Sequence, residues 1–267
     1  AEQSASGAGE PPAAAGLATE GGAGRGRSTC LKKYNNLCDP QSGNRAVLVT
    51  GSGGSGTHSL AAMFTMNGLD ILHEKVGKGG SVSWAYSVDV THTDFASDEL
   101  LPLCLRWGWL KPPQPPETHF QNVYHVVRCP VDALGSMMAW PQIDDHCSMK
   151  YLAKTLELGW PYPLDYGDMR FWATAWLKQN EFVETYAQQT FTLDNFQDLF
   201  QRVCRDSGVA AETCVSATLP LGAGHRRHAK LTWANLAAQV GAELAGKVRS
   251  AAVRYGFGED CLDDAVR

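Results

Sequence analysis

Long apolar runs are missing from this sequence: no stretch reaches the about 18 apolar residues that a membrane-crossing helix needs. The first residues also lack the charged start and apolar core of a signal peptide. With 28 acidic against 23 basic residues, the chain has a formal net charge of −5 and no basic excess. We therefore expect no nucleic acid as a partner, and a membrane contact only through a segment outside this sequence.

Metal-binding patterns are missing too. No Cys-x-x-Cys pair occurs, and the His-Glu-x-x-His and His-x-x-x-His spacings of zinc enzymes are absent. The sequence therefore predicts no metal site. It also has no Asn-x-Ser/Thr sequon, which weakens the interpretation as a glycosylated secreted protein.

The chain does contain an even number of cysteines. Eight cysteines are compatible with disulfides formed in an oxidising compartment. Cys204 and Cys214 are close enough in the chain to pin a loop, and Cys30 and Cys38 flank the start of the folded region. The alternative is that several of the eight are simply buried thiols.

Composition divides the chain into a tail and a domain. Residues 1–29 are rich in Ala, Gly, Pro and Glu with almost no large apolar side chain, so they cannot bury enough surface to offset their ordering entropy. We predict a disordered tail or stalk there. Residues 30–267 have the composition of a folded domain and are numerous enough to form one sizeable core.

Apolar patterns alternate between strand and helix along this domain. Strands are predicted at 46–50, 69–74, 122–128 and (with a turn) 189–196, and helices at 57–68, 97–110, 131–140, 170–188, 194–208 and 231–258. Between them lie a glycine-rich loop at 76–84 and a proline-rich loop at 111–117. This alternation predicts a three-layer α/β fold in which helices flank a central parallel sheet.

The most informative segment is AVLVTGSGGSGTHSL, residues 46–60. A buried strand leads into a turn in which every residue from 51 to 56 is Gly or Ser, and a helix follows. Free backbone N–H groups and the positive end of the helix dipole favour an anion at such a position. Glycines could also serve geometry alone there, because glycine adopts positive φ without strain.

Two common anions fit this loop incompletely. A loop that binds ATP or GTP needs a lysine after its last glycine, but Thr57 stands in that position, so a nucleoside triphosphatase is disfavoured. Gly51, Gly53 and Gly56 do match the G-x-G-x-x-G of a dinucleotide site, and Glu74 ends the next strand, where a ribose-binding acid belongs. A dinucleotide-dependent oxidoreductase therefore stays open, although the region that follows lacks the regular βα units of such a domain.

A third match covers more of the chain. The window VTGSGGSGTHSL resembles the 5′-phosphosulfate-binding loop of the sulfotransferases, a relative of the P-loop in which Ser-Gly-Thr follows the glycine turn. Here that triplet is Ser55, Gly56 and Thr57. The resemblance implies that backbone N–H groups of the loop, including those of Gly53 and Gly54, cradle the phosphosulfate and that the Thr57 hydroxyl adds a donor.

The family has a second phosphate-binding segment, and NVYHVVRCPVDALGSMMAW resembles it. In the family a strand ends in Arg, a Pro follows and a Ser lies further on; here these are Arg128, Pro130 and Ser136. The resemblance implies that the planar Arg128 guanidinium binds a 3′-phosphate, with a hydroxyl added by Ser136. Without the glycine loop, an Arg at a strand end could equally form a surface ion pair. His58, on the first turn of the loop helix, could touch the anion or act as a cap.

Similarity elsewhere is looser. Residues 171–186 resemble the family's Trp-containing helix, and 190–196 resemble the strand and turn that follow it. Residues 225–236 resemble the basic segment that covers the cofactor in the family. Within it, Arg226 and Arg227 could clamp the 3′-phosphate or bind an acidic acceptor, or could belong to a solvated loop.

A general base is expected directly after the strand that follows the loop helix, where the family commonly places Glu or His. Here His73 and Glu74 stand side by side at that point. Adjacent strand residues point to opposite faces, so only one should face the cleft, and we favour Glu74 over His73. The alternative for Glu74 is a surface ion pair with Lys75 or Lys78. Trp84 is a candidate for stacking on a sugar ring.

The resemblance, which runs roughly over residues 45–258, implies a sulfotransferase with a three-layer, P-loop-type α/β fold. Its donor would be 3′-phosphoadenosine 5′-phosphosulfate, its product adenosine 3′,5′-bisphosphate, and its acceptor a hydroxyl on a carbohydrate or similar molecule. Members that modify glycans and tyrosine work in the Golgi lumen, so the Golgi or secretory pathway is expected, with the cytoplasm as the alternative. A non-catalytic relative that only binds a glycan is a further alternative.

Overall fold

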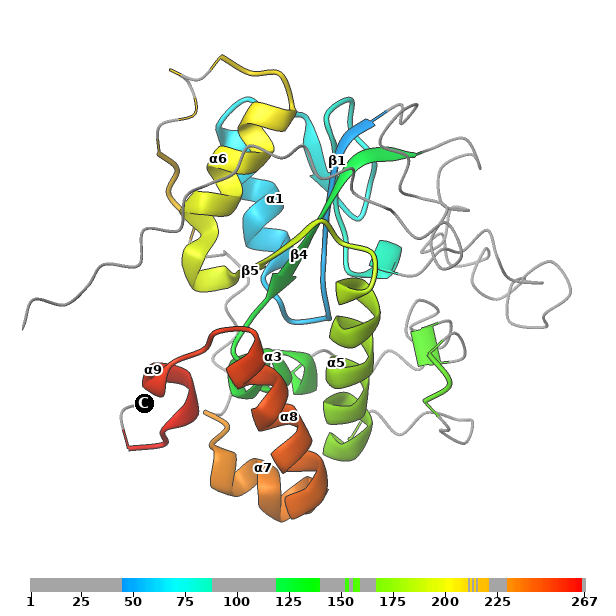
Figure 1. Ribbon diagram of the computed structural model, residues 1–267, viewed down its shortest axis with the longest axis vertical. Helices are drawn as coiled ribbons and strands as arrows, with labels where there is room; N and C mark the ends of the chain where they lie inside the picture. The colour runs from blue at the N-terminus through cyan, green and yellow to red at the C-terminus, as the bar shows by residue number, and fades with distance from the viewer. Residues whose placement is uncertain are drawn as a thin grey trace, which may run out of the picture.

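A computed structural model describes residues 45–87, 119–139, 152–153, 156–158, 167–210, 212, 214, 216–220 and 230–265. These residues form an α/β fold around a five-stranded sheet in which every strand pair is parallel (Figure 1). The predicted α/β class and parallel sheet are therefore confirmed. The predicted tail at 1–29, helix at 97–110 and proline-rich loop at 111–117 lie outside the described residues.

The sheet has the order β2-β3-β1-β4-β5. Its strands are β1 (Arg45–Thr50), β2 (Ile71–His73), β3 (Gly80–Val82), β4 (Phe120–Val127) and β5 (Gln189–Thr192). The described residues also form helices α1 (Thr57–Met66), α3 (Pro130–Met138), α5 (Met169–Glu184), α6 (Phe196–Asp206), α7 (Trp233–Val240), α8 (Ala242–Arg254) and α9 (Glu259–Leu262), with short 3-10 turns η1 (Ala85–Ser87) and η4 (Leu193–Asn195). No helix in the described part of the chain is long and apolar enough to cross a bilayer.

Helices cover both faces of the sheet because its central strands are apolar on both sides, as strands of parallel sheets usually are. α1 and α6 pack on one face, where Phe64 and Phe200 stack and share a core with Val49. On the opposite face Leu48 packs with Val183, near the end of α5. Figure 1 shows the sheet between these two sets of helices, which agrees with the predicted layers.

One strand of the sheet was not predicted. Residues 76–84 were expected to form only a loop, but β3 lies within them and pairs with both β1 and β2. β3 begins with Gly80, where a Cβ would lie 1.8 Å from the carbonyl oxygen of Val47. A three-residue strand that starts with glycine carries no apolar alternation. The connection from β2 at 74–79 is also far shorter than the about twelve residues usual between parallel strands.

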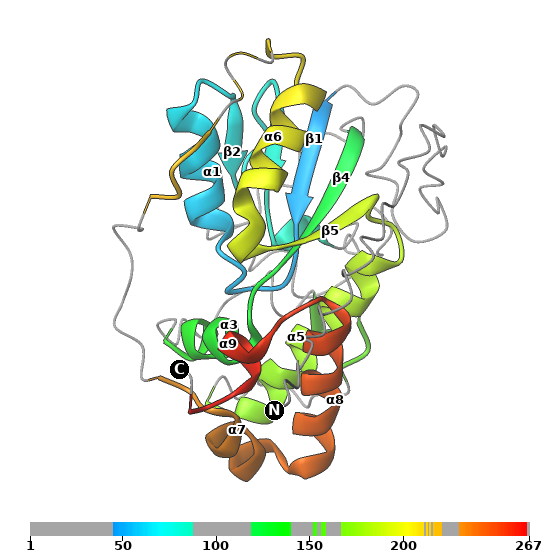
Figure 2. The same cartoon turned by 60° about the vertical axis from the view of Figure 1, so that its left-hand side comes forward.

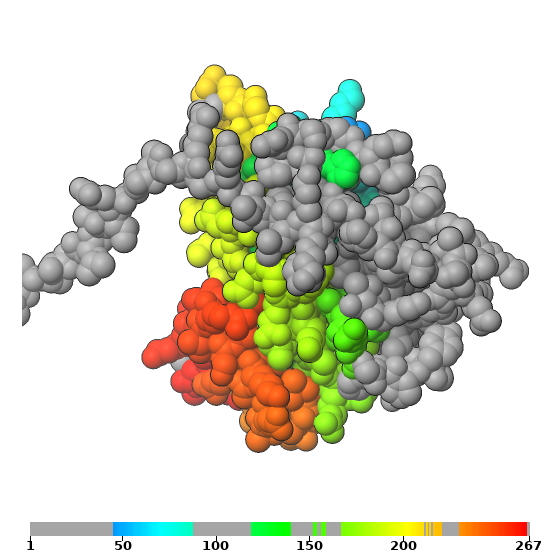
Figure 3. Space-filling view, turned by 45° about the vertical axis from the view of Figure 1, so that its right-hand side comes forward, coloured from blue at the N-terminus to red at the C-terminus, as the bar shows by residue number. Residues whose placement is uncertain are grey.

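A second core lies beyond the carboxyl ends of the strands, where α3, α5, α7 and α8 pack together (Figure 2). Trp172 and Trp176 of α5 are buried there, together with Leu236 of α7 and Val248 of α8. In the space-filling view α7 and α8 form a continuous surface with α5 (Figure 3). The ends of β1 and β4 therefore emerge from the sheet onto a packed layer of helices.

Two disulfides fall within the described residues. Cys204–Cys214 joins the end of α6 to the segment that follows, a pairing that the short spacing of the two residues allowed. Cys129–Cys261 joins the start of α3 to α9. Its partners are 132 residues apart, so no local pattern in the sequence pointed to it. The other four cysteines lie outside the described residues.

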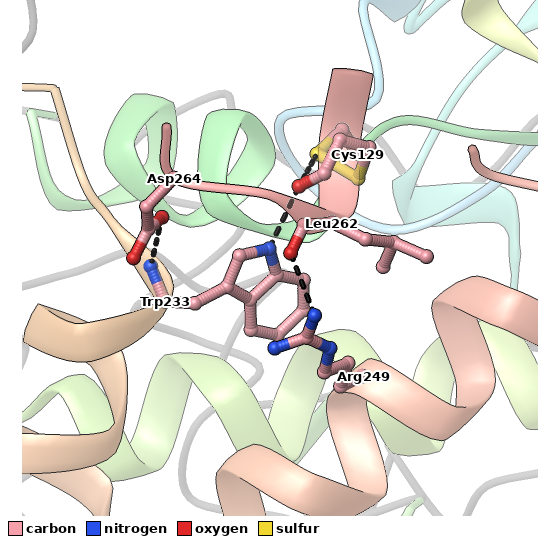
Figure 4. The surroundings of a disulfide bond; sticks show 6 residues. Cys129, Trp233, Arg249, Leu262 and Asp264 are labelled. Carbon is pink, nitrogen blue, oxygen red and sulfur yellow. Dashed lines mark hydrogen bonds between the residues drawn. A yellow bond between two sulfur atoms is a disulfide. The ribbon is translucent and has the colours of Figure 1, made fainter. Parts of the chain in front are cut away.

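The Cys129–Cys261 disulfide also anchors the start of α7 (Figure 4). The Trp233 indole donates a hydrogen bond of 2.7 Å to the Cys261 carbonyl oxygen. The Asp264 carboxylate accepts one of 2.8 Å from the backbone N–H of Trp233. The disulfide thereby attaches the C-terminal helices to Cys129, the residue that follows Arg128.

Candidate functional site

The carboxyl ends of three neighbouring strands lie together at one end of the sheet. β1 lies between β3 and β4, and all three are parallel, so the residues that follow them leave the sheet on the same side. The glycine loop 51–56 follows β1, Ser83 and Trp84 follow β3, and Arg128 follows β4. Glu74 follows β2, the next strand outward. This arrangement brings most of the predicted site residues to one end of the sheet.

The glycine loop has the backbone conformation that its composition suggested. Gly54 and Gly56 are left-handed, with φ of 75° and 85°. A Cβ on Gly51 would lie 2.1 Å from the Val126 carbonyl oxygen, and one on Gly54 would lie 2.5 Å from the Ala133 carbonyl oxygen. Glycine is therefore required here both by φ and by the close approach of the loop to β4 and α3.

Gly54→Ala should destabilise the protein more than Gly68→Ala. Both glycines are left-handed, with φ of 75° and 78°, so both substitutions carry the about 1–2 kcal/mol cost of that conformation. A Cβ on Gly68 meets nothing within 4 Å, whereas one on Gly54 meets the backbone of α3, which should add about 1–3 kcal/mol. Chemical denaturation measures both free energies of unfolding. Equal losses would contradict the close approach.

The loop also presents free hydrogen-bond donors. α1 begins after Gly56 without a side-chain cap, and the Ser55 N–H turns back to the Ser52 carbonyl oxygen at 3.3 Å. For the backbone N–H groups of Gly54, Gly56 and Thr57, the described part of the chain supplies no acceptor. Unpaired N–H groups at the positive end of a helix are the usual components of an anion site.

Arg128 reaches this loop from the end of β4. Its side chain is half-buried, and Nη1 donates a hydrogen bond of 3.3 Å to the Gly54 carbonyl oxygen. Ser136 lies on α3 one turn beyond Ala133, the residue whose carbonyl oxygen approaches Gly54. The two predicted phosphate-binding segments are therefore in contact in the fold.

Glu74 is held by the segment that follows β3. Its carboxylate accepts hydrogen bonds from the Ser83 hydroxyl at 2.5 Å and the Trp84 backbone N–H at 3.0 Å. Burial raises the pKa of Glu74 to about 7, although these two bonds and one from the Ala85 N–H lower it. A carboxylate with a pKa near neutrality is suited to accept a proton in catalysis.

His73 lies beside Glu74, not on the opposite face. Its Nε2 is 3.7 Å from Oε1 of Glu74. The prediction that only one of the two side chains can face the site is therefore wrong. The reason is that Glu74 lies just outside β2 with a left-handed φ of 50°, which breaks the alternation of the strand. Burial and the neighbouring His58 lower the pKa of His73 to about 4, so the ring is neutral at pH 7.

The roles of Thr57 and His73 are linked. The Thr57 hydroxyl lies 3.2 Å from Nε2 of His73. If Thr57 donates to an anion, its hydroxyl must accept a hydrogen bond from His73, which then carries its proton on Nε2. That nitrogen cannot also accept a proton from a reacting group. The donor role of Thr57 therefore favours Glu74 as the base.

Other predicted residues divide into three groups. Lys75, Lys78 and His58 are exposed, and the Glu74 carboxylate is bound to Ser83 and Trp84 instead of a lysine. The Trp84 side chain is 7% exposed and belongs to the core of α3 and α5, so its predicted role in stacking on a sugar is contradicted. Arg226 and Arg227 lie outside the described residues.

Sheet order weighs against a dinucleotide site. In the dinucleotide-binding fold β2 is the neighbour of β1, with the order 3-2-1-4-5-6. Here β3 separates the two strands. Glu74 directs its carboxylate to Ser83 and Trp84, at the end of this intervening strand.

Comparison of the chain with protein-family models, with curated proteins and with solved structures finds no match.

Proposed function

We propose that this chain is a sulfotransferase with a P-loop-type fold. It would transfer a sulfuryl group from 3′-phosphoadenosine 5′-phosphosulfate to an acceptor hydroxyl, with a carbohydrate as the proposed acceptor class. The observation that carries the proposal is the hydrogen bond from Arg128 to the Gly54 carbonyl oxygen. Two segments that resemble the family's 5′ and 3′ phosphate sites, and that are far apart in the sequence, meet there.

The charges of the donor match what these residues offer. The unpaired N–H groups of Gly54 and Gly56, at the start of α1, suit the phosphosulfate. The Arg128 guanidinium suits a phosphate dianion, and Ser136 of α3 is proposed as a further donor. The hydrogen bond to the Gly54 carbonyl oxygen places this guanidinium beside the glycine loop.

In the proposed reaction the acceptor oxygen forms a bond to sulfur while the bond from sulfur to the phosphate oxygen breaks. Glu74 takes the proton of the acceptor hydroxyl, and adenosine 3′,5′-bisphosphate leaves with the negative charge. Ser83 and Trp84 hold the Glu74 carboxylate in place through the reaction. The N–H groups of the glycine loop offset the charge that builds on the leaving phosphate.

The pH dependence of kcat/KM separates the two candidate bases. The base must be unprotonated, so the rate constant rises with pH through the pKa of that group. With Glu74 as the base, kcat/KM should fall as the pH drops below about 7. With His73 as the base, it should persist down to about pH 4. A profile measured from pH 4 to pH 9 would contradict the Glu74 assignment if kcat/KM did not fall until the pH approached 4.

An oxidising compartment is part of the proposal. The disulfides Cys129–Cys261 and Cys204–Cys214 suit the Golgi lumen or the secretory pathway better than the cytoplasm. Arg226 and Arg227 remain proposed contacts for the 3′-phosphate.

Transfer itself is tested by incubation of the purified chain with the donor and a panel of hydroxyl acceptors, with release of adenosine 3′,5′-bisphosphate as the signal. The proposal predicts release that depends on the acceptor and yields a sulfated product. Binding of the bisphosphate without any acceptor-dependent release would instead identify a non-catalytic binding protein.

A further inference from the structure

Two consecutive amide side chains are buried in the middle of α5. Gln179 and Asn180 are both 0% exposed, in a helix whose buried side chains are otherwise apolar or aromatic. A buried amide is costly unless its polar atoms are bonded, and here Oε1 of Gln179 lacks a partner while the other three polar atoms of the two amides have one. Their hydrogen bonds lead to the glycine loop, to the segment that follows β3 and to His125 of β4.

Asn180 binds the glycine loop twice. Its Oδ1 accepts a hydrogen bond of 3.2 Å from the backbone N–H of Ser52, and its Nδ2 donates one of 3.2 Å to the Ser52 hydroxyl. Oδ1 also lies 3.0 Å from Nε2 of His125, which must therefore carry a proton. The Thr190 hydroxyl, 3.1 Å from the other ring nitrogen of His125, then donates to it.

The same logic assigns a direction to the hydrogen bonds inside the loop. The Ser55 hydroxyl donates to the Ser52 carbonyl oxygen at 2.7 Å. Of the two hydroxyls that lie 3.0 Å apart, the one on Ser52 must then be the donor to Ser55. A single chain of hydrogen bonds, each donated toward the loop, thus runs from Thr190 through His125 and Asn180 to Ser52. The N–H and hydroxyl of Ser55 are both used within the loop, so its direct contact with an anion stays a prediction.

Gln179 joins the loop to the segment that holds the base. Its Nε2 lies 3.1 Å from the Gly51 carbonyl oxygen, 2.9 Å from the Trp84 carbonyl oxygen and 2.7 Å from the Ser87 hydroxyl, so three acceptors share the two protons of this group. Gly51 begins the glycine loop, and the backbone N–H of Trp84 binds Glu74. One side chain therefore connects the two parts of the site, which lie on different strands.

We propose that Gln179 and Asn180 are positioning residues, through which α5 fixes the glycine loop and the segment after β3 that holds Glu74 relative to each other. The inference rests on the proposed function for the ligand of the site, but the contacts themselves do not depend on it. Neither residue has to touch a substrate. Each acts on groups that do: Asn180 on the backbone of the loop, and Gln179 on the distance between the loop and the base.

Hydrogen–deuterium exchange of the full chain tests the contacts directly. Asn180→Leu keeps the branching and the number of heavy atoms of the side chain but removes every polar bond that it forms. Loss of one such bond is expected to speed exchange of the Ser52 and Ser55 amides about tenfold. The control is Gln188→Leu, an amide just before β5 that donates to the Gln121 carbonyl oxygen at the start of β4, at the opposite end of these strands from the site. It should leave the loop unchanged.

Nucleotide affinity and kinetics supply the second readout. Asn180→Leu should raise the Kd of adenosine 3′,5′-bisphosphate about tenfold or more at a temperature where the variant is fully folded, while Gln188→Leu should stay within about twofold. Gln179→Leu should lower kcat more than it changes that Kd, because it loosens the base relative to the loop. A purely structural role would lower the melting temperature and leave Kd and kcat of the folded protein unchanged.

The outcomes separate this inference from the proposed function. Faster exchange in the loop of Asn180→Leu supports the inference even if the wild-type chain binds no bisphosphate, a result that would overturn only the sulfotransferase proposal. Unchanged exchange would overturn the inference whatever the chain binds. If Asn180→Leu does not fold, a second variant is available. Thr190→Val removes the first hydroxyl of the hydrogen-bond chain at a half-buried position, and it should raise exchange of the same amides.

Discussion

Glu74→Gln is expected to lower turnover by a factor of about 10²–10⁴ while the Kd of adenosine 3′,5′-bisphosphate stays within about twofold. The amide can still accept a hydrogen bond from the Trp84 N–H, so the local structure should survive. It cannot accept the proton of an acceptor hydroxyl. Steady-state kinetics of sulfuryl transfer and calorimetric titration of the same preparations measure the two effects separately.

Glu243→Gln is the matched control for this variant. Glu243 is exposed on α8 and pairs with Lys247, so its replacement should change neither turnover nor nucleotide affinity. An unchanged turnover in Glu74→Gln would move the base to His73. In that case His73→Asn should cause the loss, and the acid limb of the pH profile should lie near pH 4.

Arg128→Ala is expected to weaken binding of adenosine 3′,5′-bisphosphate by about 2–3 kcal/mol, which is roughly 30- to 150-fold. The loss reflects removal of a charge-assisted contact with the 3′-phosphate. Adenosine 5′-monophosphate, which lacks that phosphate, should bind wild type and variant with similar affinity. Arg128→Lys should recover only part of the loss, because an ammonium group cannot form the planar bidentate contact.

Arg170→Ala provides the comparison for Arg128→Ala. Arg170 is exposed at the start of α5, and its replacement removes the same charge from a different part of the surface. It should leave the affinity for the bisphosphate within about twofold. A similar loss in both variants would show that only net charge matters. An unchanged affinity in Arg128→Ala would contradict the assignment of the 3′-phosphate.

The glycine loop could be predicted from the sequence because its determinants are contiguous. Strand, turn and helix start all lie within residues 46–60, and a run of Gly and Ser between apolar segments has few other structural explanations. Arg128 could be found for the same reason, as a charged residue that ends an apolar strand. Their contact follows once β1 and β4 are parallel neighbours, since the carboxyl ends of such strands meet.

Other features depend on contacts that no local pattern encodes. A left-handed φ at a non-glycine residue such as Glu74 is uncommon, so strand alternation placed Glu74 and His73 on opposite faces. Asn180 did leave a signal: Trp172, Trp176, Asn180 and Val183 follow helical spacing, which puts an amide on the apolar stripe of α5. Which groups that amide binds is set by β1 and β4, and only the fold reveals it.

The most direct test of the account is a calorimetric titration of the purified chain with adenosine 3′,5′-bisphosphate, with NADH and ATP titrated under the same conditions. The account predicts that the bisphosphate binds with one site per chain and that NADH and ATP bind far more weakly. Selective binding of NADH would contradict it and return the glycine loop to a dinucleotide site. Binding of none of the three would remove the phosphosulfate donor from the account altogether.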